Sequence, residues 1–171
     1  MTFTTAFQAS LLAGALVVTA LPAQAQEIER TYPGPNAFIA STVTVPAGSE
    51  IIFLSGQLPS VADPAAPAGT VAAYGDTEAQ SESTFNKIRA LLETRGLTMA
   101  DVVSMTVYLV APPGSERMDF AGMMRAYSRH FGTPDQPNRP SRSTVQVAGL
   151  AGPGFLVEIE VTAARTPVPA P

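Results

Sequence analysis

Cysteine is absent from this 171-residue sequence, and histidine occurs once, at position 130. The lack of cysteine excludes disulfides, thiol nucleophiles and thiolate metal sites, and a single histidine excludes a multi-histidine metal site within one chain. Charge is also scarce, since charged residues make up 14% of the chain, the net charge is −4, and no basic run stands out. Because binding to phosphate backbones requires clustered Lys and Arg, the sequence disfavours nucleic acid as a partner.

The first 25 residues carry no charged side chain. A short apolar run, Leu11 to Leu21, precedes Ala23-Gln24-Ala25, which is a small-x-small cleavage signature. The run falls short of the roughly 20 residues that a membrane-spanning helix needs. We therefore predict a signal peptide over 1–25 that is cleaved after about Ala25, export to the periplasm, and no membrane attachment of the mature chain. An uncleaved anchor is the alternative, because the α-amino group supplies the only positive charge before the apolar run.

The rest of the chain predicts one α+β domain over 37–164, with a loose N-terminal arm at 26–36 and a Pro-rich tail at 165–171. Alternating apolar residues and turn signals predict the strands, at 37–45, 50–55, 70–73 (a short edge strand), 103–109, 144–147 and 155–163. The first two are expected to form an antiparallel hairpin. The order β-β-(β)-α-β-α-β-β predicts a single mixed sheet of about six strands with two helices on one face. The opposite face would be partly polar, which makes oligomerisation through it a hypothesis.

Apolar residues at helical spacing predict the two helices. The first begins with a capping box at 77–80 (TEAQ) and ends before Gly96. The second begins near Ser115 and carries an apolar stripe that Gly132 closes, made of Met118, Ala121, Met124, Tyr127 and Phe131. His130 lies near the C-terminus of this helix, where the helix dipole favours a charged imidazole, and we assign it no catalytic role.

Residues 137–163 contain the side chains best suited to chemistry. A proline-stiffened loop leads to Arg142 at the start of one strand, and a Gly/Pro turn leads to a second strand on which Glu158 lies among apolar residues. A hairpin-like return would bring this guanidinium and carboxylate together as a small site for an anionic substrate. The plainer interpretation is that both are solvated, and Glu160, about 7 Å from Glu158 on the same strand face, is interpreted as structural.

Three short motifs occur in a distinctive order along the chain: SGQLP at 55–59, RSTV at 142–145 and VEIE at 157–160. Together with VVSMTVYLV at 102–110 and the aromatic end of the second helix, they resemble the RidA/YjgF family of enamine/imine deaminases. The resemblance covers about residues 37–163. It implies a chorismate-mutase-like α+β fold that assembles as a homotrimer, with ligand pockets between the subunits.

The resemblance also implies roles for individual residues. Arg142 would bind the carboxylate of a 2-imino acid, and Glu158 would orient the attacking water or move protons around it. Backbone groups at Thr144, where many members have cysteine, would line the pocket, and Ser55 and Gly56 would form its other wall.

Two positions depart from the family pattern. The usual pocket tyrosine belongs to a GPY segment that this chain lacks, and its position falls at about Thr42. A pocket asparagine on the second helix falls at Met124. The loss of both side chains predicts a more open or more apolar pocket.

The function implied by the resemblance is hydrolysis of 2-imino acids, such as 2-iminobutanoate and 2-iminopropanoate, to 2-keto acids and ammonia. The reaction needs a held substrate, a placed water and one group that moves protons, so no metal or organic cofactor is expected. The alternative is a non-catalytic exported homotrimer whose intersubunit clefts bind a small carboxylate or a protein partner. Arg142 and Glu158 favour the enzyme, whereas Thr42 and Met124 favour the alternative.

Overall fold

Four strands form the central sheet of the structure, a computed structural model that describes residues 27–166. They are β3 (Glu50–Gln57), β4 (Val102–Leu109), β5 (Ser141–Gln146) and β6 (Val157–Arg165), in the spatial order β3-β6-β4-β5. β6 runs antiparallel to both β3 and β4, whereas β4 and β5 are parallel, so the sheet is mixed. The predicted signal peptide and most of the predicted tail lie outside the described residues.

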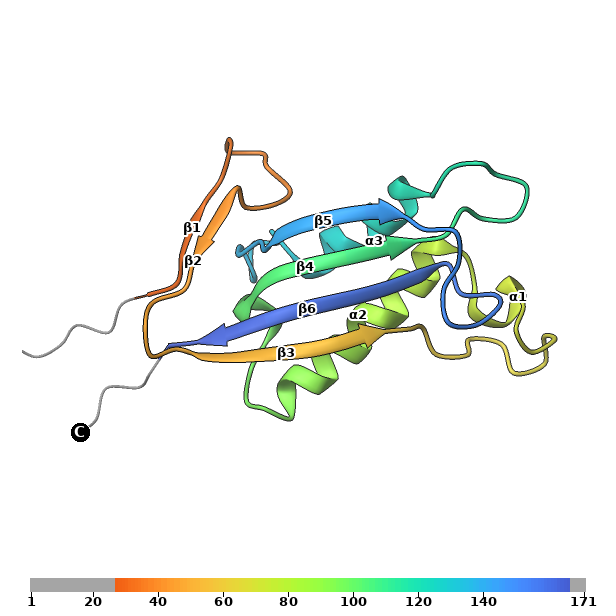
Figure 1. Cartoon of the computed structure of the whole chain (residues 1–171), viewed down its shortest axis with the longest axis horizontal. Helices are drawn as coiled ribbons and strands as arrows, with labels where there is room; N and C mark the ends of the chain where they lie inside the picture. The colour runs from red at the N-terminus through yellow and green to blue at the C-terminus, as the bar shows by residue number, and fades with distance from the viewer. Residues whose placement is uncertain (1–26, 167–171) are drawn as a thin grey trace, which may run out of the picture.

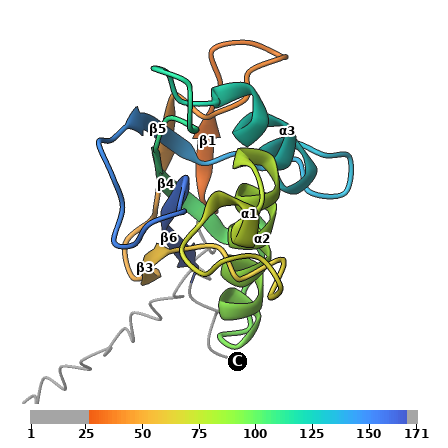
Figure 2. The ribbon, with the colours of Figure 1, turned by 90° about the vertical axis from the view of Figure 1, so that its right-hand side faces the viewer.

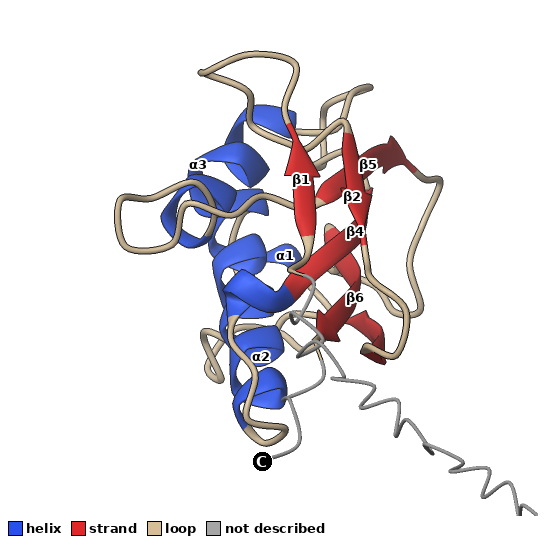
Figure 3. Cartoon of the chain, turned by 90° about the vertical axis from the view of Figure 1, so that its left-hand side faces the viewer, coloured by secondary structure: helices blue, strands red, loops and turns tan. Residues whose placement is uncertain are grey.

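The two long helices lie on the same face of this sheet. Figures 2 and 3 show α2 (Thr77–Glu93) and α3 (Phe120–His130) as one layer and the strands as the other. Two shorter helices, α1 (Val71–Tyr74) and the 3-10 helix η1 (Met99–Asp101), precede α2 and β4. The predicted α+β class, with a mixed sheet and two helices packed on one face, is confirmed.

Strict alternation along the two central strands builds the core. On β4 and β6 every second side chain points toward the helices and is buried, and α2 supplies the facing apolar residues at helical spacing. The buried residues of these three elements include Phe85, Ile88, Leu92, Val103, Met105, Val107, Leu109, Val157, Ile159, Val161 and Ala163.

The N-terminal part of the domain differs from the prediction. Residues 27–36 do not form a loose arm throughout, because β1 (Glu29–Thr31) pairs with β2 (Thr42–Thr44) in a separate two-stranded ribbon (Figure 1). Arg30 anchors the ribbon, since its Nη2 donates a hydrogen bond to the carbonyl oxygen of Ala100 at 3.0 Å. The predicted hairpin between the first two strands is therefore wrong. The described strands divide into a sheet of four and a ribbon of two, rather than one sheet of six.

The helix boundaries also differ in detail. Residues 71–74 form α1 instead of an edge strand. Asp76, not Thr77, caps α2 by accepting a hydrogen bond from the Ala79 N–H, and the Gln80 side chain turns inward, where it accepts from the Leu156 N–H and donates to two backbone carbonyls. Two of these three bonds join Gln80 to the segment before β6, and they replace the purely local bonds of a capping box.

The second helix begins later than predicted, at Phe120, with Asp119 as its cap. Its buried face is also rotated from the predicted stripe. The buried residues are Gly122, Met123, Ala126, Tyr127 and His130, because α3 packs against α2 as well as against the sheet. Met124 consequently lies at the edge of the core, half-buried, and Ala121 is exposed.

None of the helices within residues 27–166 has the length and apolar character needed to span a membrane.

Candidate functional site

Arg142 lies on the helix-covered side of the edge strand β5. It pairs with Met105 of β4, a buried core residue, so its side chain points toward α3 rather than toward the open face of the sheet. Its Cζ atom lies 4.2 Å from the centre of the Tyr127 ring and 5.9 Å from that of Phe120. Aromatic faces attract a guanidinium and hold its plane in place.

The hydrogen-bonding capacity of this guanidinium is largely unused. Nη2 contacts the Met124 sulfur at 3.2 Å, and a thioether is a weak acceptor. Nη1 is buried and has no hydrogen-bond partner among residues 27–166. Burial lowers the pKa of Arg142, an effect that the nearby Tyr127 partly offsets, but an arginine remains protonated under ordinary conditions. A buried, charged and unpaired donor predicts an anionic ligand.

Thr144 presents a second unsatisfied polar group on the same side of β5. Residues two apart on a strand share a face and lie about 7 Å apart, so the Thr144 side chain follows that of Arg142 along the strand. Its Oγ1 is buried and, within the described part of the chain, also lacks a hydrogen-bond partner. The structure thus brings together Arg142, Thr144 and Met124, three of the predicted site residues.

A groove of about 740 Å³ opens beside Arg142. Its apolar lining includes Phe38, Phe120 and Met124, and neither phenylalanine was predicted as a site residue. Tyr127 positions the first of them, because its buried hydroxyl donates a hydrogen bond of 2.8 Å to the carbonyl oxygen of Phe38. Burial, opposed by the charge of Arg142, raises the pKa of Tyr127 to about 12, so the phenol remains a donor at neutral pH.

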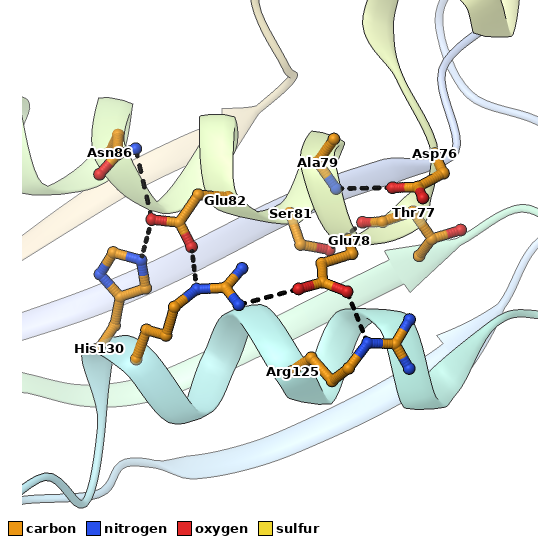
Figure 4. A network of polar contacts seen from close by, with 10 residues as sticks. Asp76, Thr77, Glu78, Ala79, Ser81, Glu82, Asn86, Arg125 and His130 are labelled. Carbon is orange, nitrogen blue, oxygen red and sulfur yellow. Dashed lines mark hydrogen bonds and ion pairs between the residues drawn. The ribbon is translucent and has the colours of Figure 1, made fainter.

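The charged rim of the groove is neutralised by ion pairs between α2 and α3 (Figure 4). Glu78 accepts hydrogen bonds from Arg125 and from Arg129, and Arg129 also bonds Glu82 at 2.8 Å. These bonds lower the pKa of Glu78 and raise those of both arginines. His130 Nε2 lies 3.0 Å from Glu82, a contact that accounts for this histidine without catalysis. Among the residues that line the groove, Arg142 is therefore the cation left for a ligand.

Glu158 does not join Arg142 within one chain. β4 lies between β5 and β6, so the predicted hairpin-like return is wrong. Glu158 pairs with Tyr108, whose hydroxyl donates to Glu160 at 3.1 Å on the open face of the sheet. Arg142 and Glu158 thus point to opposite faces, because Arg142 pairs with the core residue Met105 whereas Glu158 pairs with Tyr108 of the open face.

Ser55 and Gly56 accompany Glu158 instead. A Cβ atom added to Gly56 would lie 1.9 Å from Glu158 Oε1, so the carboxylate packs directly on the glycine backbone. Ser55, with Ser104, Thr106 and Glu160, lines a shallow pocket of about 280 Å³ on the same open face. The two walls predicted for one pocket therefore belong to two regions of the chain.

Thr42 does not line the groove beside Arg142 in the single chain, and its role in a ligand pocket stays a prediction. Thr42 is exposed in the ribbon, and its hydroxyl bonds that of Thr31 at 2.7 Å. The aromatic side chain that this segment places beside Arg142 is Phe38, because the Ala40 N–H bonds the Pro140 carbonyl and holds residues 37–40 against the start of β5. Phe120 was also not predicted as a site residue, although its i, i+4 spacing from Met124 places both side chains on one helix face.

Within residues 27–166, no cluster of three or more acidic or histidine side chains is placed to hold a metal ion. The described site thus offers one guanidinium, one hydroxyl and an apolar groove on the helix-covered face, with two carboxylates on the open face.

Comparison with known proteins identifies relatives that match most of the chain. The family model described as endoribonuclease L-PSP matches residues 37–165. A RutC family protein of Haemophilus influenzae is 35% identical over 139 residues, covering 81% of this chain and 97% of that protein. TdcF of Escherichia coli K12, named as a reactive intermediate deaminase, is 30% identical over 141 residues, covering 82% and 98%.

Solved structures resemble the chain over a similar length. The crystal structure of E. coli TdcF with bound serine superposes with a TM-score of 0.53 at 29% identity, covering 82% of this chain and 98% of that one. The Rid-family protein YyfB of Yersinia pestis superposes with a TM-score of 0.61 at 21% identity, a likeness of fold alone, covering 82% and 100%.

Proposed function

The chain belongs to the RidA/YjgF family, and on that premise we propose that it hydrolyses 2-imino acids to 2-keto acids and ammonia. The family includes relatives named as reactive intermediate deaminases, which supports a function of the RidA type. The reaction consumes one water and releases the imine nitrogen as ammonia. The predicted signal peptide places this activity, as part of the proposal, in an exported compartment.

One observation carries the proposal: the buried Nη1 of Arg142 has no partner in the described chain, and Nη2 has only a sulfur. A carboxylate has two oxygens that match the fork of a guanidinium and form two charge-assisted hydrogen bonds. A carboxylate bound there would displace the Met124 sulfur. The Thr144 hydroxyl, also unsatisfied, is available to a second polar atom of the same ligand, such as the imine nitrogen.

Glu158 enters this site in the proposal from a neighbouring copy of the chain. It cannot come from the same chain in the described arrangement, because Arg142 and Glu158 point to opposite faces of one sheet. The open face also carries exposed apolar side chains, including Phe53 at 78% and Val145 at 41% exposure, as expected of a surface that another subunit covers. A homotrimer is the assembly we propose, with each site formed between two subunits.

In the proposed reaction, Arg142 holds the carboxylate while water attacks the imine carbon. As the new C–O bond forms, Glu158 takes one proton from this water and passes it to the imine nitrogen, giving a neutral tetrahedral carbinolamine. Glu158 then takes the hydroxyl proton of the carbinolamine and delivers it to the amine nitrogen as the C–N bond breaks, so that the ketone and ammonia are released. One carboxylate that alternates between base and acid supplies both transfers.

Nuclease activity, which the family description names, fits the site less well. A nucleic-acid site requires several free cations along a backbone track. In the groove Arg125 and Arg129 are already paired with Glu78 and Glu82. A single free guanidinium among apolar side chains suits a small monoanion.

The first test measures ammonia released from 2-iminobutanoate and 2-iminopropanoate generated in situ, after subtraction of spontaneous hydrolysis. The purified protein should accelerate release, and Arg142→Ala should lower kcat/KM by about 100-fold or more, because loss of a buried charge-paired donor costs several kcal/mol. Arg142→Lys is the matched control, since it keeps the charge but loses the planar fork. No acceleration by a folded protein would overturn the proposal.

A mixing experiment tests the shared site. Arg142→Ala and Glu158→Gln are each expected to be nearly inactive, but refolding the two together should restore activity. In a ring of subunits about one quarter of the interfaces would then carry both intact residues. A mixture no more active than its components would refute the intersubunit site.

A second candidate function is a non-catalytic trimer that binds a small carboxylate. The contact of Met124 with Arg142 favours it, because the thioether occupies part of the guanidinium without contributing to chemistry. Carboxylate binding that Arg142→Ala abolishes, without any accelerated hydrolysis, would support this function.

A further inference from the structure

The groove beside Arg142 is apolar along most of its length. Phe38 and Phe120 are 62% and 42% exposed, although buried positions are the usual place for phenylalanine. Both line the same groove as Met124 and Arg142. The two rings come from distant parts of the chain, the segment after β1 and the first turn of α3, and meet at the Arg142 guanidinium, whose buried Nη1 has no hydrogen-bond partner among residues 27–166. An apolar surface that ends at an unpaired cation matches a ligand with one anionic end and an apolar body.

The extent of the groove agrees with this match. In the single chain it is open to solvent and has a volume of about 740 Å³, so it continues past the guanidinium and leaves room there for more than a three- or four-carbon imino acid. Polar side chains at the rim offer little further recognition, because Glu78 holds both Arg125 and Arg129. The space beyond the carboxylate therefore favours apolar atoms.

Met124 is suited to contact such a ligand. Its side chain is long and flexible, and thioethers make favourable contacts with aromatic rings. A carboxylate arriving at Arg142 would displace the sulfur from Nη2, because a charged oxygen is a much better acceptor. The displaced thioether would then lie against the body of the ligand, beside Phe120 one turn away on the same helix face.

From these observations we infer that the substrates are 2-imino acids with a large apolar side chain, aromatic or branched, and that Phe38, Phe120 and Met124 select them. The inference rests on the proposed function, since it names the substrate class of that same site. The carboxylate of the substrate binds Arg142 and its side chain lies along the groove. Small imino acids leave most of the groove filled with water and gain little from it.

The experiment compares kcat/KM for two imines made in situ by an amino-acid oxidase from phenylalanine and from alanine. The purified protein should favour the phenylalanine imine by at least about 10-fold, because filling a hydrophobic pocket with a few carbons changes specificity by roughly 10–200-fold. Phe120→Ala should lower that ratio by about 10-fold. Leu91→Ala is the matched control, since Leu91 is also 42% exposed but lies on α2 outside the groove, and it should leave the ratio unchanged.

The outcomes separate this inference from the function on which it rests. Acceleration of the alanine imine equal to or greater than that of the phenylalanine imine would overturn the inference and leave the deaminase standing. An unchanged ratio in Phe120→Ala would likewise remove the groove as the selecting surface. Acceleration of neither imine would overturn both.

Discussion

The two faces of the sheet differ in how the hydrogen-bonding groups of their polar side chains are satisfied. On the open face of the single chain they are accessible to solvent or paired with one another, as Tyr108 is with Glu160. On the helix-covered face Arg142 and Thr144 carry buried polar atoms without hydrogen-bond partners among residues 27–166. Water can satisfy the first group at little cost, but an unsatisfied buried donor costs about 1–3 kcal/mol. The comparison shows that the helix-covered face, despite being the core side, is where the fold leaves capacity for a ligand.

The arginines of the same region sharpen the contrast. Arg129 forms hydrogen bonds to Glu78 and Glu82 and is partly exposed. The guanidinium of Arg142 instead contacts the Met124 sulfur and the rings of Phe120 and Tyr127. Arg129 joins α3 to α2 through ion pairs, whereas Arg142 forms no ion pair within residues 27–166. The contrast supports the proposed role of Arg142 in ligand binding.

The largest expected effect is that of Arg142→Met, which should lower activity and raise the free energy of unfolding. Arg142→Met replaces a buried unpaired charge with an apolar side chain of similar length, and it should cut imine hydrolysis by about 100-fold or more. It should also raise the free energy of unfolding by about 1 kcal/mol, because the relieved desolvation of about 1–3 kcal/mol exceeds the lost cation–π contact. Urea denaturation and the ammonia assay measure the two quantities on one preparation.

Arg129→Met provides the comparison for that variant. It should leave kcat/KM for the alanine imine within a few-fold of the original, and it should lower stability by at most about 1 kcal/mol, because its ion pairs are partly exposed. If Arg142→Met were the less stable of the two, Arg142 would have to be a structural residue, and the contrast between the arginines would be wrong.

Local sequence patterns were sufficient for most of the fold. Alternation placed β4 and β6 correctly, and the i, i+3, i+4 spacing of apolar residues placed α2. The pairing of strands was harder to predict. β2 pairs with the nearby β1 instead of with β3, and β3 pairs with β6, about a hundred residues further along the chain. Such pairings depend on the whole set of elements that need covering, not on the turn between two neighbours.

The candidate site could likewise be predicted only in part from the sequence. Arg142 and Thr144 share a face because they lie two apart on one strand, which the sequence alone can indicate. Their separation from Glu158 could not be read locally, because it depends on β4 lying between β5 and β6. Phe38 was missed for a related reason: the Ala40–Pro140 backbone bond that holds its segment beside β5 joins residues 100 positions apart.

A smaller effect is expected on the open face, from Gly56→Ala. The new Cβ atom would lie 1.9 Å from Glu158 Oε1, so the carboxylate must move. The glycine does not have a positive φ, so the backbone accepts alanine without strain. Activity should fall by 10-fold to on the order of 100-fold, because a displacement of about 1 Å is enough to disturb proton transfer.

Gly149→Ala is the control for this variant, because a Cβ atom there meets nothing within 4 Å. It should retain the activity and the stability of the original protein. Full activity in Gly56→Ala would mean that the position of Glu158 on the open face is unimportant for catalysis, and the assignment of a proton-moving role to it would fail.

The smallest expected effect is a pH dependence confined to the ion pairs between α2 and α3. Burial lowers the pKa of His130, although Glu82 partly opposes the shift. The unfolded chain, whose imidazole titrates near 6.5, therefore takes up this proton before the folded protein does. As the pH falls below about 6.5 the free energy of unfolding should decrease. The charge of Arg142 does not change in this range, so the groove contributes nothing to the loss.

The contribution of Glu82 appears only at lower pH. Burial acts to raise the pKa of this carboxyl group, but the bonds and charges of Arg129 and His130 bring it below its ordinary value. Its stabilisation is present above the unfolded pKa of about 4.3 and is lost as the pH falls through the lower folded pKa. Thermal midpoints of the protein and of His130→Gln, measured from pH 8 to pH 4, should thus differ in one respect: the variant lacks the decline that begins near pH 6.5. If the thermal midpoint declined equally in both proteins, the decline would arise from groups other than His130. The contact of His130 with Glu82 would then contribute nothing to the pH dependence of stability.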